Sequence, residues 1–239
     1  MDWRKKLAEN IIINRAPRKR NNFIGKIAQK RAEENYRLAS FFVTGKKILD
    51  IGAGYGNGYN FLLAQNPREI TCLDQHGDSL NNFLFKDERI SFLKQDFLKN
   101  TLQDKSYDVV LCLGTIFYIK NHNFLLTEIR QILRDDGVLI LNCLNADLIR
   151  AYFGFNLEEI NEKFSRIYNR EELLTLVKRH FSGVVEEYVQ LPIRTNPRLI
   201  YLFSLLLAPF MALFKTPKVV LRKNGFEGIY NYLIIFKHN

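Results

Sequence analysis

The middle of the chain alternates between short apolar runs and stretches in which apolar residues recur every three or four positions. A short apolar run suits a buried strand, whereas the longer periodicity suits an amphipathic helix. The predicted strands are 46–51, 69–73, 89–94, 107–113 and 137–143. The predicted helices between them are about 57–65, 78–86 and 122–134. Strands alternating with helices indicate βαβ units, so we expect an α/β fold with a doubly wound, Rossmann-like sheet.

Further elements flank this region. An amphipathic helix is predicted from Asn22 to about Phe42, because apolar residues there fall on or near one face. Further helical signals occur at 147–152, 157–167 and 170–180, and two more strands are predicted near 183–189 and 230–236.

About forty residues, 191–229, separate the last two predicted strands, which is far more than a hairpin turn needs. They include the uncharged run Leu199–Phe214, which is too short for a straight crossing of a bilayer and is flanked by basic residues. The run is either a segment lying in a membrane interface or an internal lid or dimer helix. The resulting division is a basic N-terminal helical cap (1–44), a core (45–190), an apolar and basic insertion (191–229) and the last strand (230–239).

The most informative motif is the stretch Lys46–Gly56, an apolar run that ends in Asp50 and continues into alternating glycines. Glycines allow a sharp turn and a close approach of the backbone to a ligand, and a helix beginning near Asn57 directs N–H groups to the same place. The dinucleotide fingerprint Gly-x-Gly-x-x-Gly fails, because its third glycine falls on Asn57 or Tyr59. The Gly-Lys-Ser/Thr of a Walker loop is absent as well.

The pattern Asp-x-Gly-x-Gly-x-Gly resembles motif I of the class I S-adenosylmethionine-dependent methyltransferases, and similar motifs follow in order over about 46–145. The resemblance implies a sheet of seven strands with an antiparallel last strand. It also implies that S-adenosylmethionine is bound by loop residues and by residues at the ends of the next strands. The implied cofactor-binding residues are Asp50, Gly52, Ala53, Gly54, Gly56, Asp74, Gln75, Asp96, Phe97, Leu113 and Gly114.

Several of these residues have a role in the family. In relatives, an acidic residue that ends strand two holds the ribose hydroxyls, and Asp74 matches it; the alternative is a turn former at a strand end. Asp96 and Phe97 match the adenine-binding pair, or else Asp96 caps a loop, and Gln75 is expected to flank the adenine. Leu113 and Gly114 match the residues whose backbone meets the methionine ammonium.

The catalytic residues are less well marked. The Asn/Asp-Pro-Pro-Tyr/Phe motif of enzymes that methylate amide or exocyclic amino nitrogens is replaced by Gly-Thr-Ile-Phe at 114–117. Tyr118 occupies the position where many relatives carry a functional histidine, and it is a candidate for orienting the acceptor. His122 is a candidate base, although a solvated residue at a helix start is the plainer interpretation.

Charge is distributed unevenly along this chain of net charge +10. Residues 1–44 hold 11 Lys and Arg against 4 Asp and Glu, residues 191–239 hold 7 against 1, and residues 45–190 hold 17 against 20. The basic ends indicate an anionic partner, such as an anionic membrane surface, or serve solubility alone. The three cysteines lack metal-ligand spacing, so we expect free thiols and no metal site.

Together these features predict a methyltransferase that acts on oxygen or carbon of a lipid-like or lipid-linked small molecule. The first residues lack the apolar core of a signal peptide, so a cytoplasmic protein, peripheral on the membrane at most, is expected. An RNA methyltransferase that uses the basic ends is an alternative, although aromatic residues are not interleaved with the cluster at 15–20. A non-catalytic cofactor-binding module is another, and the oligomeric state stays open.

Overall fold

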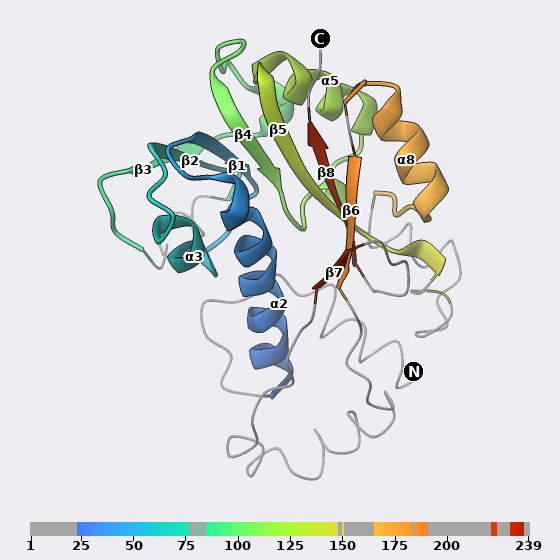
Figure 1. Ribbon diagram of the computed structural model, residues 1–239, viewed down its shortest axis with the longest axis horizontal. Coiled ribbons are helices and arrows are strands. Elements are labelled where there is room, and N and C mark those ends of the chain that lie inside the picture. Colours follow the sequence, from blue (N-terminus) through green and yellow to red (C-terminus); the bar gives the residue numbers. More distant parts are fainter. Residues whose placement is uncertain are drawn as a thin grey trace.

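The computed structural model describes residues 23–76, 81, 85–147, 150, 165–183, 185–190, 221–223 and 230–236. These residues form one eight-stranded sheet with helices packed against both of its faces (Figure 1). The α/β, Rossmann-like fold predicted from the sequence is therefore confirmed.

The order of elements follows the predicted alternation of strands and helices. The first strands are β1 (Lys47–Ile51), β2 (Glu69–Asp74), β3 (Ile90–Lys94), β4 (Tyr107–Cys112) and β5 (Leu133–Leu144). The described helices up to β5 are α2 (Phe23–Ala39), α3 (Tyr59–Leu63) and α5 (His122–Ile132), with 3-10 turns η2 (Ser40–Phe42), η3 (Phe97–Lys99) and η4 (Ile116–Tyr118). The later elements are α8 (Arg170–Lys178), β6 (Val185–Gln190), β7 (Leu221–Lys223) and β8 (Tyr230–Phe236).

The spatial order of the strands determines where a ligand binds. Strands β1 to β5 run parallel in the order β3-β2-β1-β4-β5. The chain moves outward from β1 to β3 and then returns to the other side of β1 to form β4. In open α/β sheets, ligands bind outside the carboxyl ends of the strands at such a switch in direction. The glycine-rich segment after β1 and the segment after β4 both lie at this edge.

The sheet continues beyond β5 in a different way. Strand β8 pairs antiparallel with both β5 and β6, and β7 pairs antiparallel with β6. The described residues thus form eight strands rather than the seven that were expected. The additional strand, β7, lies within 191–229 and has only three residues, too few for a period to be visible in the sequence.

Several predicted features lie wholly or largely outside the described residues. They are the basic cluster at 15–20, the helix at 78–86, the helical signals at 147–152 and 157–167, and the apolar run Leu199–Phe214. Helix α3 begins at Tyr59 rather than near Asn57, because Gly58 at its N-cap has a left-handed backbone with φ of 99°.

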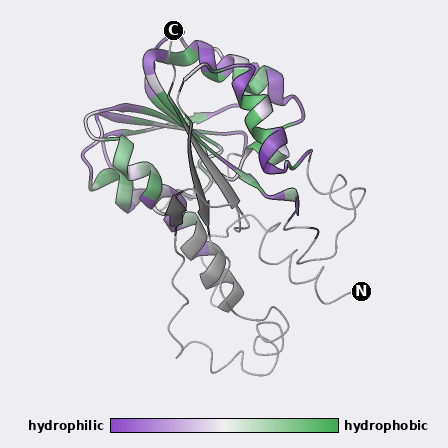
Figure 2. Ribbon diagram, turned by 45° about the vertical axis from the view of Figure 1, so that its right-hand side comes forward, coloured by the Kyte–Doolittle hydropathy of each residue, from purple (hydrophilic) through white to green (hydrophobic). Residues whose placement is uncertain are grey.

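The sheet separates two apolar cores. The buried residues of α2 and α3 pack on one face against Ile48, Ile70 and Leu111, and those of α5 and α8 pack on the other face against Leu49 and Val110. In Figure 2 the coloured strands are mainly apolar, while α5 and α8 show apolar and polar residues side by side. This arrangement is expected for helices with one buried and one solvated side.

Helix α5 allows a direct test of this packing. Leu125 is fully buried, whereas its neighbour Phe124 is 40% exposed. We expect Leu125→Ala to lower the free energy of unfolding by about 2–5 kcal/mol, because the truncation leaves a cavity in the core. Phe124→Ala is the matched control and should change stability by about 1 kcal/mol or less. Denaturant titration measures both, and equal losses would contradict the assigned faces of α5.

Candidate functional site

Asp50, the next-to-last residue of β1, has a buried carboxylate that accepts hydrogen bonds from two phenol hydroxyls. Its Oδ2 accepts hydrogen bonds from Tyr36 at 2.8 Å and from Tyr59 at 2.6 Å. The side chain is only 1% exposed, and its Oδ1 has no hydrogen-bond partner among the described residues. Burial raises the pKa of Asp50 to about 6, although the bonds from Tyr59 and Tyr36 act in the opposite direction. The oxygen Oδ1 is itself buried and keeps an unused capacity to accept a hydrogen bond.

The glycine loop lies between the end of β2 and the segment after β4. The Gly52 amide donates to the Leu73 carbonyl at 2.7 Å, and a Cβ on Gly52 would lie 2.3 Å from Thr115 Oγ1. A Cβ on Gly54, by contrast, would meet no atom within 4 Å. The loop is therefore packed against protein at Gly52 and open to a ligand at Gly54.

Asp74, at the end of β2, joins this loop directly. Its Oδ2 accepts from the Gly54 amide at 3.0 Å, and its Oδ1 accepts from the His76 amide at 2.8 Å. Each carboxylate oxygen keeps a second lone pair, so Asp74 retains capacity to accept hydrogen bonds from a diol. The neighbouring Gln75 donates a hydrogen bond from its Nε2 to Nε2 of His76, 3.1 Å away.

The predicted adenine-binding pair lies beside Asp74 at the same edge of the sheet. The amide of Gln95 donates to the Asp74 carbonyl at 3.2 Å, which holds the ends of β2 and β3 together. Asp96 caps η3 by accepting from the Leu98 amide at 3.1 Å, as the loop-cap alternative expects. Phe97 is 3% exposed and belongs to the core on the α5 side.

The segment after β4 is positioned by a residue that the sequence analysis missed. The Gly114 amide donates to Oδ1 of Asn142, a side chain on β5 that is fully buried. The Asn142 Nδ2 has no hydrogen-bond partner among the described residues. A signal was present, because Asn142 is a polar residue within an apolar strand. A Cβ on Gly114 would meet open space, so the Leu113–Gly114 backbone faces an accessible region.

The two catalytic candidates differ in their surroundings. Tyr118 ends η4 and is 38% exposed, with its ring 4.8 Å from that of Phe117. His122 begins α5, as expected, but it is 6% exposed rather than solvated.

Both ring nitrogens of His122 are engaged. Nε2 lies 2.9 Å from the Ile116 carbonyl, and Nδ1 is hydrogen-bonded to the Tyr168 hydroxyl. Burial lowers the pKa of His122, so the neutral ring is favoured. A carbonyl can only accept, so Nε2 carries the proton and Nδ1 accepts from Tyr168. In this state His122 anchors η4 and has no free lone pair for a substrate proton.

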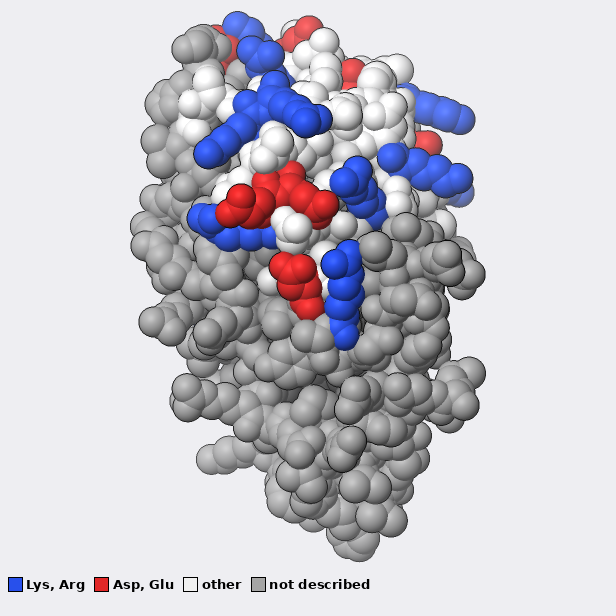
Figure 3. Space-filling view, turned by 90° about the vertical axis from the view of Figure 1, so that its right-hand side faces the viewer, with Lys and Arg blue, Asp and Glu red and all other residues white. Residues whose placement is uncertain are grey.

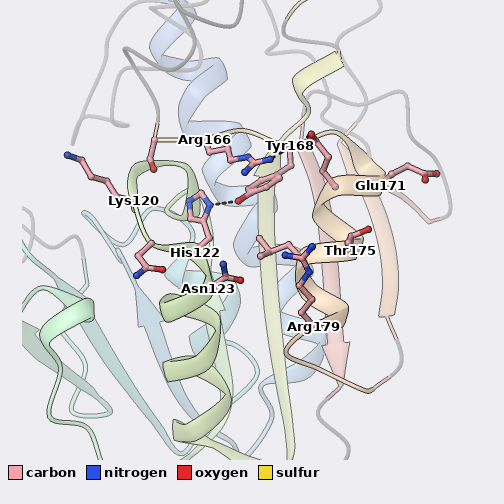
Figure 4. Close-up of a pocket in the computed structure, with 12 residues that line it drawn as sticks. Lys120, His122, Asn123, Arg166, Tyr168, Glu171, Thr175 and Arg179 are labelled. Carbon is pink, nitrogen blue, oxygen red and sulfur yellow. Dashed lines mark hydrogen bonds and ion pairs between the residues drawn. The ribbon is translucent and has the colours of Figure 1, made fainter.

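A polar pocket of about 490 Å³ lies between the start of α5 and α8. Figure 4 shows Lys120, His122 and Asn123 on one side of it and Tyr168 and Arg179 on the other. None of the predicted cofactor-binding residues lines this pocket. Basic and acidic side chains are interspersed on the face that carries α8 (Figure 3), where Arg166 lies 3.8 Å from Glu172.

Comparison with known proteins places this geometry in context. Residues 49–141 match the methyltransferase domain family. A fatty-acid O-methyltransferase of Mycolicibacterium smegmatis is 29% identical over 102 residues, which cover 41% of this chain and 37% of the relative. A tRNA U34 carboxymethyltransferase of Nautilia profundicola is 28% identical over 105 residues, covering 41% of this chain and 34% of the relative. The matched part therefore spans less than two-fifths of either relative.

A solved structure covers more of the chain. An S-adenosylmethionine-dependent methyltransferase of Thermotoga maritima, described as a possible histamine N-methyltransferase, aligns with a TM-score of 0.65. The alignment covers 87% of this chain and 91% of that chain at 17% identity. Likeness at this level of identity concerns the fold.

The raised pKa of Asp50 predicts a pH-dependent gain in stability for Asp50→Asn in the ligand-free protein. At about pH 4 the aspartate is protonated in the folded chain and about half protonated in the unfolded chain, so the two proteins should differ by less than about 1 kcal/mol. As pH rises from 3.8 to about 6, the wild type loses up to about 3 kcal/mol, because the unfolded chain ionises first. Thermal or urea unfolding between pH 4 and 8 measures this difference.

The control for this experiment is Asp136→Asn, whose side chain is 78% exposed. We expect no pH-dependent change in that variant. A stability gap for Asp50→Asn that stays constant, or that widens toward acid pH, would contradict the ionised burial of Asp50.

Proposed function

We propose that this chain is a class I S-adenosylmethionine-dependent methyltransferase that methylates oxygen or carbon of a lipid-like or lipid-linked small molecule, with S-adenosylmethionine as its cofactor. The observation that supports cofactor use is the convergence of the unpartnered Oδ1 of Asp50, the open backbone at Gly54 and Asp74 at one sheet edge. Asp50 Oδ1 is a buried acceptor without a donor, and the backbone at Gly54 borders open space that a Cβ would not fill. This combination fits a cationic nucleoside.

The residues of this edge have separate roles in the proposal. Asp50 provides the negative charge for the methionine ammonium, and the Leu113–Gly114 backbone adds a carbonyl acceptor beside it. Asp74 accepts from the ribose hydroxyls, while the adenine lies by Gln75, Asp96 and Phe97. When bound, the cofactor supplies a methyl group on a positively charged sulfur.

The chemistry that remains for the protein is alignment of the acceptor, exclusion of bulk water and, where the acceptor is a hydroxyl or a carbon that carries a proton, release of that proton to solvent. Transfer from a sulfonium is an in-line displacement, so the acceptor atom must be held at about 3 Å from the methyl carbon. Tyr118, which follows β4 at the same edge and is partly exposed, is the candidate for orienting the acceptor. His122 is better suited to fixing the position of η4, because Ile116 and Tyr168 occupy both of its nitrogens.

The acceptor class rests on sequence features and on one relative. The fatty-acid O-methyltransferase acts, by its name, on a lipid, and the uncharged run Leu199–Phe214 between basic residues suits contact with lipid. The tRNA U34 relative keeps the RNA alternative in view. None of the helices among the described residues is long and apolar enough to cross a bilayer. We propose peripheral contact with an anionic membrane.

Labelled methyl transfer tests the proposed activity. Purified protein given methyl-labelled cofactor and a total cell extract should place label in the organic phase that contains lipids. Asp74→Asn should reduce incorporation by about ten-fold or more, because it removes the charge that attracts the ribose hydroxyls and one of the two oxygens that accept from the Gly54 and His76 amides. The exposed Asp136→Asn is the control with the same chemical change and should retain activity. Label in RNA would favour the alternative enzyme, and cofactor binding without any transfer would favour the binding module.

Vesicle flotation tests the membrane proposal. We expect the protein to float with anionic vesicles at low salt and to be released at high salt, because the attraction to lipid phosphates is screened. Lys215→Glu with Lys218→Glu should abolish flotation. Lys105→Glu with Lys178→Glu makes the same change of charge at two exposed positions within residues 45–190 and should have little effect on flotation. A wild-type protein that stays at the bottom of the gradient at low salt would refute peripheral binding.

A further inference from the structure

Two tyrosines from different helices converge on a single oxygen of the Asp50 carboxylate. Tyr36 belongs to α2, which precedes the residues that match the methyltransferase domain family, and Tyr59 is the first residue of α3. Both hydroxyls donate to Oδ2, so Oδ1 is left as the oxygen without a partner among the described residues. The pair therefore determines which oxygen of Asp50 keeps an unused capacity to accept a hydrogen bond.

The packing of the two helices fixes this arrangement. Helices α2 and α3 lie side by side (Figure 1), and the two tyrosine rings meet edge to face with centroids 5.1 Å apart. Gly58 makes the approach possible, because a Cβ there would lie 2.9 Å from the Tyr36 ring and 3.0 Å from the Glu33 backbone. The bond from Tyr36 thus depends on a glycine immediately before α3.

Among the titratable groups of the described residues around Asp50, the two phenol hydroxyls are the ones that donate hydrogen bonds to its carboxylate. Burial raises the pKa of both tyrosines and of the Cys72 and Cys112 thiols, so these groups on α2, α3, β2 and β4 stay protonated near neutral pH. Asp74, at the end of β2, is the nearby like charge and disfavours ionisation of Asp50. Among the described residues, no positively charged group acts on the pKa of Asp50 to offset the effect of Asp74.

We propose that Tyr36 and Tyr59 are positioning residues of the cofactor site: they hold Asp50 ionised, direct Oδ1 toward the methionine ammonium and make cofactor affinity depend on pH. This inference rests on the proposed function, because it assumes that S-adenosylmethionine occupies the edge described above. It also makes α2 part of the cofactor site, although that helix lies outside the matched residues 49–141.

The proposal has a quantitative consequence for pH. An ammonium is attracted by the ionised carboxylate and not by the neutral acid, so affinity follows the ionised fraction of Asp50. Because burial places the pKa of Asp50 at about 6, affinity should fall as pH drops through that value. Removing either phenol takes away a hydrogen bond that favours the ionised form, so the pH midpoint should rise.

Calorimetric titration with S-adenosylhomocysteine between pH 5 and 8 tests this. This product carries the same ammonium and lacks the methyl group, so the readout is independent of turnover. We expect Tyr36→Phe and Tyr59→Phe each to raise the midpoint by about one pH unit. Affinity then falls about five-fold at pH 6 and by less than about two-fold at pH 8. Phenylalanine keeps the ring packing, which separates loss of the hydroxyl from loss of the core.

Tyr107→Phe is the matched control. Tyr107 is also buried, but its hydroxyl donates to the neutral Thr71 Oγ1 at 3.2 Å. This variant should give the wild-type pH curve, including any titration of the ligand itself. A wild-type curve for Tyr36→Phe and Tyr59→Phe, or an equal shift for Tyr107→Phe, would overturn the proposal.

The wild-type protein provides a second measurement that does not depend on the folding of either variant. A flat affinity between pH 5 and 8 overturns the role of the tyrosines while leaving the proposed function intact. Absence of S-adenosylhomocysteine binding at every pH would overturn the proposed function, and this inference with it.

Discussion

A negative charge kept out of water at the end of the central strand is the constraint on which the site depends. Asp50 is 1% exposed and is flanked by β2 and β4, so nearly all of its hydration has to be replaced. Two phenol hydroxyls replace part of it, and the remainder is left unsatisfied at Oδ1. Burying an ionised carboxylate without full compensation is unfavourable, and a cation bound at Oδ1 would offset part of that cost.

The neighbouring features serve the same end. The glycine loop brings its backbone against the end of β2, and Asp74 holds the loop at the Gly54 amide. Asn142 reaches from β5 to the Gly114 amide and so sets the segment after β4. Carboxylate, loop and strand-end carbonyl are therefore placed by three adjacent strands of one sheet. A rigid sheet supports such a site more accurately than separate loops do.

The sequence was sufficient for the parts governed by local patterns. Buried parallel strands are continuous apolar runs, and a ligand-binding turn must be rich in glycine, so β1, β2, β4 and the loop after Asp50 could be located. The order of strands and helices then implied the edge at which Asp74 meets the loop and near which the segment after β4 lies. Strand β7 could not be found this way, since three residues carry no readable period.

Contacts between distant segments could not be predicted. Tyr36 looked like one more residue on the apolar face of a helix, and nothing near it in the sequence indicates a bond to Asp50. His122 was interpreted as a solvated residue at a helix start, yet it is buried, and Tyr168, 46 positions later, is hydrogen-bonded to its ring. Partners of this kind are set by tertiary packing, which leaves no periodic trace in either segment.

The place of β8 has a consequence for how the chain matures. This strand lies between β5 and β6, both of which precede it in the sequence. Until residues 230–236 emerge during synthesis, β5 is an open edge strand of the parallel sheet, and β6 has no neighbour that joins it to that sheet. Open edges invite pairing with other chains, so an incomplete translation product would be prone to aggregate. The sheet can be completed only after residues 230–236 have left the ribosome.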